Sequence, residues 1–311
     1  MNSQQIGIIS ILKSALDGNK RTLPDDFDVA VAVKVAQKHQ ISAMFYYGAL
    51  NCGISSSHPN MEQLFLQTCA LISVSEQQMH SINEIFRLFD QNGIKYMPLK
   101  GTLLKKLYPK SEMRTMSDAD ILINTEQYDD IKPLMQSLGF SEILESDHEL
   151  VWQKSNVHIE LHKRLIPSYN KDYYEYFGDG WRLGKPCEEG ACRYVMSAED
   201  EMIYLFTHFA KHYRDAGIGI KHFIDLWVFR SSVKELNPEY ILCELKKLEL
   251  ADFYKNIIRT LDVWFCEQPS DALARSAKRI LVDRTVNYDG VCDAFVFDFK
   301  SKIRRSESPV A

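Results

Sequence analysis

Apolar and polar positions alternate with the period of an α-helix over residues 1–92. Apolar side chains recur every three or four residues in IGIISILKSAL, in DVAVAVKVAQKHQ and in the long run MEQLFLQTCALISVSEQQMHSINEIFRLFDQNG. This spacing places them on one face of a helix. Gly93 ends the last run, because glycine commonly stops a helix. The pattern predicts an all-helical N-terminal region.

Between residues 93 and 168 the period changes. Five short runs have the composition and alternation of β-strands, namely IKYMPL, DADILI, SEILE, ELVWQK and VHIELH. Two helical stretches lie among them, GTLLKKLY and TEQYDDIKPLMQSLGF, the second with Thr125 as its expected N-cap and Gly139 at its end. This order predicts a small mixed sheet with helices packed on one side.

Helical periodicity returns in the remaining region, residues 169–311. It begins clearly at Ser197, which precedes three acidic residues as a helix N-terminus favours, and the first run ends at Gly217. Four more helical runs follow, the last of them DALARSAKRILVDR, before a polar tail that we expect to be frayed. The fold class is therefore α+β, a small mixed sheet flanked by N-terminal and C-terminal helical regions.

Composition narrows the range of partners. The 311 residues include 37 basic and 42 acidic side chains, for a formal charge of -5. This balance gives no general attraction to nucleic acid or to an anionic membrane, so any phosphate must be bound locally. The sequence leaves the oligomeric state open.

Several features indicate a cytoplasmic protein. The seven cysteines are scattered without C-x-x-C spacing, which predicts neither a disulfide framework nor a zinc knuckle. The apolar run near the N-terminus is broken by Lys13 and no basic region precedes it, so we expect no signal peptide. No apolar segment approaches the roughly 20 residues that span a bilayer. We expect no membrane segment.

Candidate chemistry begins at the strand DADILI. Side chains alternate between the faces of a strand, so Asp118 and Asp120 point one way while Ala119, Ile121 and Ile123 point the other. Acids at strand ends are often only solvated features. Two carboxylates on one face nevertheless repel each other unless a cation lies between them, and Mg²⁺ is the usual partner of carboxylates and substrate phosphates.

The strand VHIELH has the same design. His158, Glu160 and His162 share a face, so Glu160 is a candidate third acid. Three acids on two strands can hold two metal ions about 3.5 to 4 Å apart, next to a triphosphate. His162 could contact a phosphate or satisfy a neighbouring carboxylate, and both interpretations stay open.

Donors for the phosphates lie just upstream. Gly101 stands between a strand and a short helix, where free backbone N–H groups favour an anion, and Thr102 can add a hydroxyl. Lys100 and Arg114 are candidate charge partners of the same phosphates. The alternative is that these two are surface charges that balance the acids.

Two stretches, PLKGTLLKKLYPKSEMRTMSDADILI and HIELHKRL, resemble the nucleotidyltransferases of the DNA polymerase β-like superfamily. That superfamily has a glycine and a small residue, a gap, an acid-apolar-acid-apolar strand and a third acid on a later strand. The L-K-G start, the arginine before DADILI and the ELH strand are similar to a bacterial family of uncharacterised nucleotidyltransferases. The resemblance is strongest over residues 94–165 and weaker over 197–230. Residues 1–90 resemble it only in being helical.

The resemblance implies an enzyme with NTP as co-substrate and two Mg²⁺ ions, or Mn²⁺, as cofactors. Asp118, Asp120 and Glu160 would be the catalytic metal ligands, and Gly101 with Thr102 the phosphate-contacting turn. NMP would pass to a hydroxyl or phosphate of an unidentified small-molecule or protein acceptor. The alternatives are an inactive nucleotide-binding or partner-recognition module with this fold, and an RNA-extending enzyme, which the absence of basic runs beyond KIRR counts against.

One further pair of residues has metal-ligand spacing. His208 and His212 lie four residues apart on one predicted helix. Phe209 follows His208 where a zinc metalloprotease would have glutamate. We therefore favour a role in packing, or in lining the nucleotide cleft, over zinc binding.

Overall fold

The computed structural model describes residues 1–215 and 217–266. The predicted helix at 271–284 and the polar tail lie outside the described residues. The chain forms two compact units, each made of separate stretches of sequence. Among the described residues, one unit comprises Met1–Phe65, Ile203–Ser231 and Leu242–Cys266, and the other comprises Leu66–Met202 with Ser232–Ile241.

The first unit is helical, as the periodicity predicts. Its elements are α1 (Ser3–Asp17), α2 (Val29–Lys38), α3 (Ser42–Asn51), most of α8 (Ala198–Asp215), α9 (Ile220–Ser232), part of α10 (Pro238–Lys247) and α11 (Ala251–Phe265). A capping box between Asn2 and Gln5 begins α1, and Gly18 ends it in the left-handed conformation. Apolar faces of these helices form the core of this unit.

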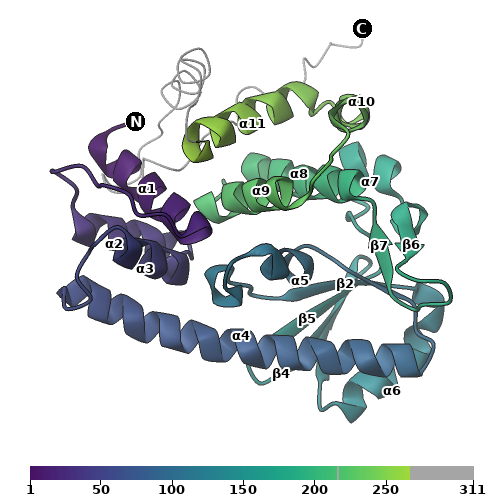
Figure 1. Cartoon of the computed structure of the whole chain (residues 1–311). Coiled ribbons are helices and arrows are strands. Elements are labelled where there is room, and N and C mark those ends of the chain that lie inside the picture. The colour runs from purple at the N-terminus through teal and green to yellow at the C-terminus, as the bar shows by residue number, and fades with distance from the viewer. Residues whose placement is uncertain (216, 267–311) are drawn as a thin grey trace, which may run out of the picture. The chain divides into compact units, whose positions relative to one another are not determined.

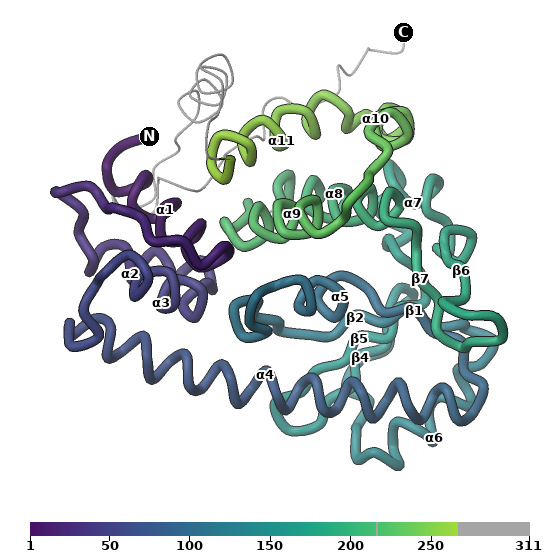
Figure 2. The backbone as a smooth tube through the Cα atoms, in the orientation of Figure 1, coloured from purple at the N-terminus to yellow at the C-terminus, as the bar shows by residue number. Residues whose placement is uncertain are grey.

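The second unit contains a five-stranded mixed sheet (Figure 1). Its strands are β1 (Tyr96–Pro98), β2 (Ala119–Ile123), β3 (Ser141–Glu145), β4 (Glu149–Lys154) and β5 (Val157–His162). Their spatial order is β1-β2-β5-β4-β3, which the backbone trace in Figure 2 shows for β1, β2, β5 and β4. β2 and β5 run parallel, and the other neighbours are antiparallel.

One face of this sheet is the core of the unit. Ile121, Trp152 and Ile159 are fully buried there, together with apolar residues of α4 (Pro59–Gln91) and α6 (Tyr128–Ser137). The neighbouring positions along each strand point to the opposite face. The predicted arrangement, with helices on one side of a small mixed sheet, is confirmed.

Local details differ from the expectation at two places. The side chain of Asn124, not Thr125, caps the turn before α6, because residues 125–127 form a 3₁₀ turn first. A two-stranded sheet of β6 (Gly184–Pro186) and β7 (Tyr194–Met196) lies inside the region expected to be helical. Two short helices precede this sheet in the chain, α5 (Gly101–Leu104) in the middle region and α7 (Lys171–Phe177) in the C-terminal region. Glycine and proline in the GKP strand disfavour helix there, and the cysteine-containing segment forms the connection.

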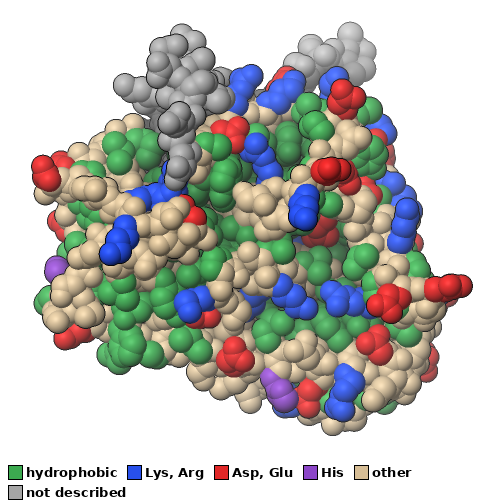
Figure 3. Space-filling view, in the orientation of Figure 1, with side chains coloured by type: hydrophobic (Ala, Val, Ile, Leu, Met, Phe, Trp, Pro, Cys, Tyr) green, Lys and Arg blue, Asp and Glu red, His purple; other side chains and the backbone are tan. Residues whose placement is uncertain are grey.

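The surface agrees with the charge balance. On the face in Figure 3, basic and acidic side chains lie interspersed among apolar and uncharged groups. None of the described helices combines the length and apolarity needed to cross a membrane.

Candidate active site

The acids Asp120 and Glu160 lie side by side on the polar face of the sheet. They are directly paired in the parallel register of β2 with β5, and Leu122 is paired with His162 two positions further along. The side-chain ligand atoms of Asp120, Glu160 and His162 all lie within 4.8 Å of one another. The structure therefore brings together two of the three predicted acids and the predicted histidine.

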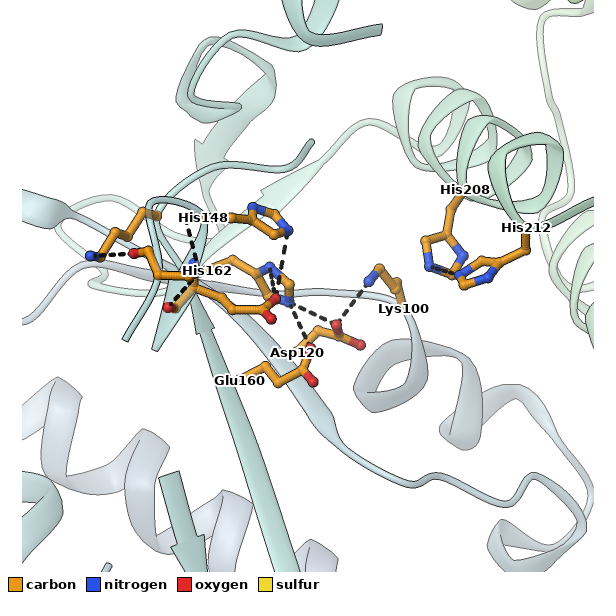
Figure 4. Close-up of polar contacts among 10 residues, drawn as sticks. Lys100, Asp120, His148, Glu160, His162, His208 and His212 are labelled. Carbon is orange, nitrogen blue, oxygen red and sulfur yellow. Dashed lines mark hydrogen bonds and ion pairs between the residues drawn. The ribbon is translucent and has the colours of Figure 1, made fainter. Parts of the chain in front are cut away.

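Lys100 joins this group from the turn between β1 and α5 (Figure 4). Its Nζ lies 2.8 Å from Oδ1 of Asp120. Lys100 has φ 42° and ψ -110°, a conformation that favours glycine. Such backbone strain is typical of functional sites, where the surrounding structure holds it in place. The turn therefore places the Lys100 ammonium next to the buried Asp120 carboxylate.

Oδ1 of Asp120 is shared by two side chains, Lys100 and His162. His162 Nε2 lies 2.8 Å from the same oxygen that contacts Lys100. Burial alone would raise the pKa of Asp120, but the Lys100 ammonium and the hydrogen bond with His162 hold it well below its usual range. Burial alone would lower the pKa of His162, but its contacts with the carboxylates of Asp120 and Glu160 raise it. Asp120 is therefore ionised, with both of these contacts on one oxygen.

Asp118 is placed just before β2 and is less buried than Asp120. Its Oδ2 accepts a hydrogen bond from Ser117 Oγ at 3.0 Å. Burial, followed by repulsion from the charges of Asp120 and Glu160, raises the pKa of Asp118. This repulsion between Asp118 and the two neighbouring carboxylates is what a bound cation would relieve.

The predicted phosphate turn has a different internal arrangement from the one expected. Thr102 is buried, and its hydroxyl donates to the Leu99 carbonyl at 2.7 Å, so this hydrogen is directed into the protein. Arg114 is buried rather than a surface charge, and Lys100 is largely buried. A Cβ added to Gly101 would lie 2.6 Å from Arg114 Nη1 and 2.6 Å from Met116 Sδ. Gly101 is thus required for close packing of the arginine against the turn.

Sequence reasoning missed two carboxylates of this unit. Glu149 pairs with His162 between β4 and β5, and burial and the charge of Glu160 raise its pKa. The sequence carried a signal for this pairing, because two residues, Ser155 and Asn156, connect β4 to β5, and so short a turn fixes which residues of the two strands lie opposite each other. Glu201, in the first turn of α8, is 5% exposed, and burial raises its pKa to about 8 although the Lys100 charge opposes the shift. No pattern in the sequence pairs Glu201 with Lys100.

The two histidines of α8 contact each other. His208 Nε2 and His212 Nε2 are 3.0 Å apart, so one ring donates a hydrogen bond to the other. This contact accords with a packing role. The nucleotide-cleft role remains a prediction.

The mixed sheet presents two of the predicted acids from parallel neighbouring strands, and Lys100 reaches them from the turn after β1. The chain belongs to a family of uncharacterised nucleotidyltransferases, whose family model matches residues 25–266. The match extends well beyond the segments that carry the motifs, and it includes most of the N-terminal helices.

Among solved structures, the chain is similar to the antibiotic-resistance factor ANT(2'')-Ia, whose solution structure was described with substrate-regulated conformation dynamics. The two are 14% identical, with a TM-score of 0.39, over 61% of this chain and 97% of that one. At this level the likeness carries no information about the acceptor. No curated protein matches the sequence.

Proposed function

We propose that this protein transfers NMP from an NTP to a hydroxyl or phosphate of a small-molecule or protein acceptor, with divalent metal ions as cofactors. The observation that supports this most is the direct pairing of Asp120 with Glu160, next to Lys100 and close enough to Asp118 for their charges to repel. Membership of the nucleotidyltransferase family supports the same reaction class.

The donor set fits hard divalent ions. Carboxylate oxygens are the ligands that Mg²⁺ and Mn²⁺ prefer, and the repulsion that raises the pKa of Asp118 is what a bound cation would relieve. Asp118, Asp120 and Glu160 would hold the ions. When bound, the ions supply positive charge that offsets the charge of the triphosphate in the transition state.

The chain's own residues bind and orient the substrates. Lys100 has its ammonium at the acid cluster, where it can also contact a phosphate oxygen. Arg114, packed against Gly101, positions the turn, and the backbone N–H of Gly101 is the expected phosphate donor, since that of Thr102 donates to the Leu99 carbonyl. His162 holds the Asp120 carboxylate in place.

The transfer step follows from these positions. An acceptor oxygen attacks the α-phosphorus, a new O–P bond forms, and the bond to pyrophosphate breaks. Glu160 takes the acceptor proton as general base. Acids and cations fixed in advance lower the barrier because they need no rearrangement during the reaction.

The test uses α-labelled NTPs. We would incubate the full chain with Mg²⁺ or Mn²⁺ and each NTP, and follow label transfer and pyrophosphate release across sugar phosphates, metabolites and protein hydroxyls. A variant with Asp118→Asn and Asp120→Asn should lose both signals. Asp130→Asn, an exposed acid on α6, is the matched control and should keep them.

Two results would contradict the proposal. If wild type and the double variant are equally inert and bind NTP equally well, the protein is a recognition module with the fold of a nucleotidyltransferase. If transfer requires a polynucleotide acceptor, the RNA-extending alternative is correct.

A further inference from the structure

Three side chains outside the proposed catalytic trio converge where β4 begins and β5 ends. They are His148 in the preceding turn, Glu149 at the start of β4 and His162 at the end of β5. Glu149 Oε2 lies 3.6 Å from His148 Nε2 and 3.8 Å from His162 Nδ1. One ligand atom from each residue lies within 4.8 Å of the other two. The three side chains therefore direct their ligand atoms toward one common position.

These separations suit a small metal ion. Zinc binds histidine nitrogen at about 2.0–2.1 Å and carboxylate oxygen at about 2.0–2.2 Å, so neighbouring ligands in a tetrahedral site are roughly 3.4 Å apart. The separations of Glu149 Oε2 from the two histidines exceed this by a few tenths of an ångström, and one nitrogen of each histidine lies within 4.8 Å of the other. Rotation of the side chains would bring the three groups onto one ion. Two imidazoles and one carboxylate favour a transition ion over Mg²⁺, which prefers oxygen ligands.

His162 is arranged as a metal ligand on its second nitrogen. Nε2 contacts Asp120 Oδ1 at 2.8 Å, and the ring is 2% exposed. Nδ1 is buried, has no hydrogen-bond partner among the described residues and faces Glu149. Metal-bound histidines usually donate their other N–H to a carboxylate, which fixes the tautomer. The Nε2–H tautomer leaves the Nδ1 lone pair available for an ion.

The turn that carries the other two ligands is held in place. Ser146 Oγ accepts from the backbone N–H groups of His148 at 3.2 Å and Glu149 at 3.0 Å. Lys163 Nζ donates to the Ser146 carbonyl at 2.8 Å and ties the turn to the end of β5. A site whose ligands are already fixed loses less conformational entropy when the ion binds.

We propose that His148, Glu149 and His162 bind one divalent transition ion of the Zn²⁺ class. The side chains of His148 and Glu149 are 13% and 24% exposed, so solvent reaches this group and a water would complete its coordination. This ion is separate from those held by the carboxylate trio. It fixes His162, and through His162 it positions the Asp120 carboxylate.

The test uses Co²⁺ as a spectroscopic probe on the full chain, with excess Mg²⁺ present to occupy sites made only of carboxylates. We expect one equivalent to bind with the visible absorption of a four-coordinate nitrogen and oxygen site, and Zn²⁺ to displace it. His148→Ala and Glu149→Gln should each weaken binding by more than about 10-fold, since loss even of an outer partner costs about that much.

Three control variants are matched to other sources of signal. His80→Ala removes an exposed histidine with a carboxylate, Glu84, one turn away, and His208→Ala removes one of the paired histidines of α8. Both should bind Co²⁺ as wild type does. Asp118→Asn should also keep the Co²⁺ signal while losing NMP transfer, which separates this proposal from the proposed function.

Several results would overturn the proposal: no stoichiometric binding, an intense thiolate-to-Co²⁺ band that places the ion on cysteine, a signal lost in His208→Ala, or binding unchanged in both His148→Ala and Glu149→Gln. Circular dichroism of each variant establishes that it is folded. Glu149→Gln keeps the size of the side chain and is the decisive variant if His148→Ala does not fold.

Discussion

Replacing Lys100 with methionine tests how the acid cluster is held together without metal. Methionine keeps an unbranched side chain and a Cβ, so the strained backbone at this position is the same in both proteins. The substitution removes the charge 2.8 Å from Asp120 Oδ1. Asp120 then remains buried beside Glu160, with His162 as its remaining hydrogen-bond partner.

The expected loss of stability follows from this geometry. The side chains of Lys100 and Asp120 are 15% and 7% exposed. Removing one partner of a buried pair typically costs about 3–5 kcal/mol. His162 stays 2.8 Å from the same oxygen and retains part of that compensation. We therefore expect the free energy of unfolding to fall by about 2 kcal/mol in EDTA.

The assay is urea unfolding followed by tryptophan fluorescence, which reports on this unit through the buried Trp152. Lys106→Met, an exposed lysine six positions further on, is the control and should change stability by less than about 0.5 kcal/mol. Mg²⁺ should stabilise Lys100→Met more than wild type, because a bound cation replaces the lost charge. Our reasoning is wrong if Lys100→Met matches wild type in EDTA, or if Lys106→Met loses as much.

Three more outcomes are expected. In Gly101→Ala the added Cβ would lie 2.6 Å from Arg114 Nη1, so the arginine must shift. We expect the free energy of unfolding to fall by about 1 kcal/mol and ATP binding, measured by calorimetry, to weaken. Unchanged binding would show that the arginine does not act on the nucleotide. The pKa of Glu201 is higher in the folded protein than in the unfolded chain, so wild type should lose stability as pH rises from about 4.5 to about 8. Glu201→Gln cannot ionise and should not show this loss. The advantage of this variant in urea unfolding should grow to about 5 kcal/mol by about pH 9, because the pKa of Glu201 lies about 3.5 above its ordinary value, and an advantage independent of pH would refute this. Asp118→Asn removes repulsion from its neighbours, so metal-free thermal stability should hold or rise while NMP transfer falls roughly 100-fold; a destabilised metal-free protein would contradict this.

The alternation of side chains in the sequence predicted much of this site. DADILI and VHIELH each place acids on one face and apolar groups on the other, and both strands form with that division. The reason is local, because a strand has a period of two whatever it packs against. The predicted phosphate role of Thr102 is a case where local pattern is insufficient, since the direction of its hydroxyl depends on the turn made by Leu99.

The sequence by itself determined most of the helices, the five strands of the main sheet and which face of β2 and β5 carries the acids. Only the tertiary structure decided that β2 lies parallel to β5, which brings Asp120 within 2.8 Å of His162 across 42 positions. It also decided that Lys100 points at that acid and that Glu149 completes a group with two histidines. The physical reason is that parallel neighbours are joined by long connections, so their pairing depends on the packing of the whole unit.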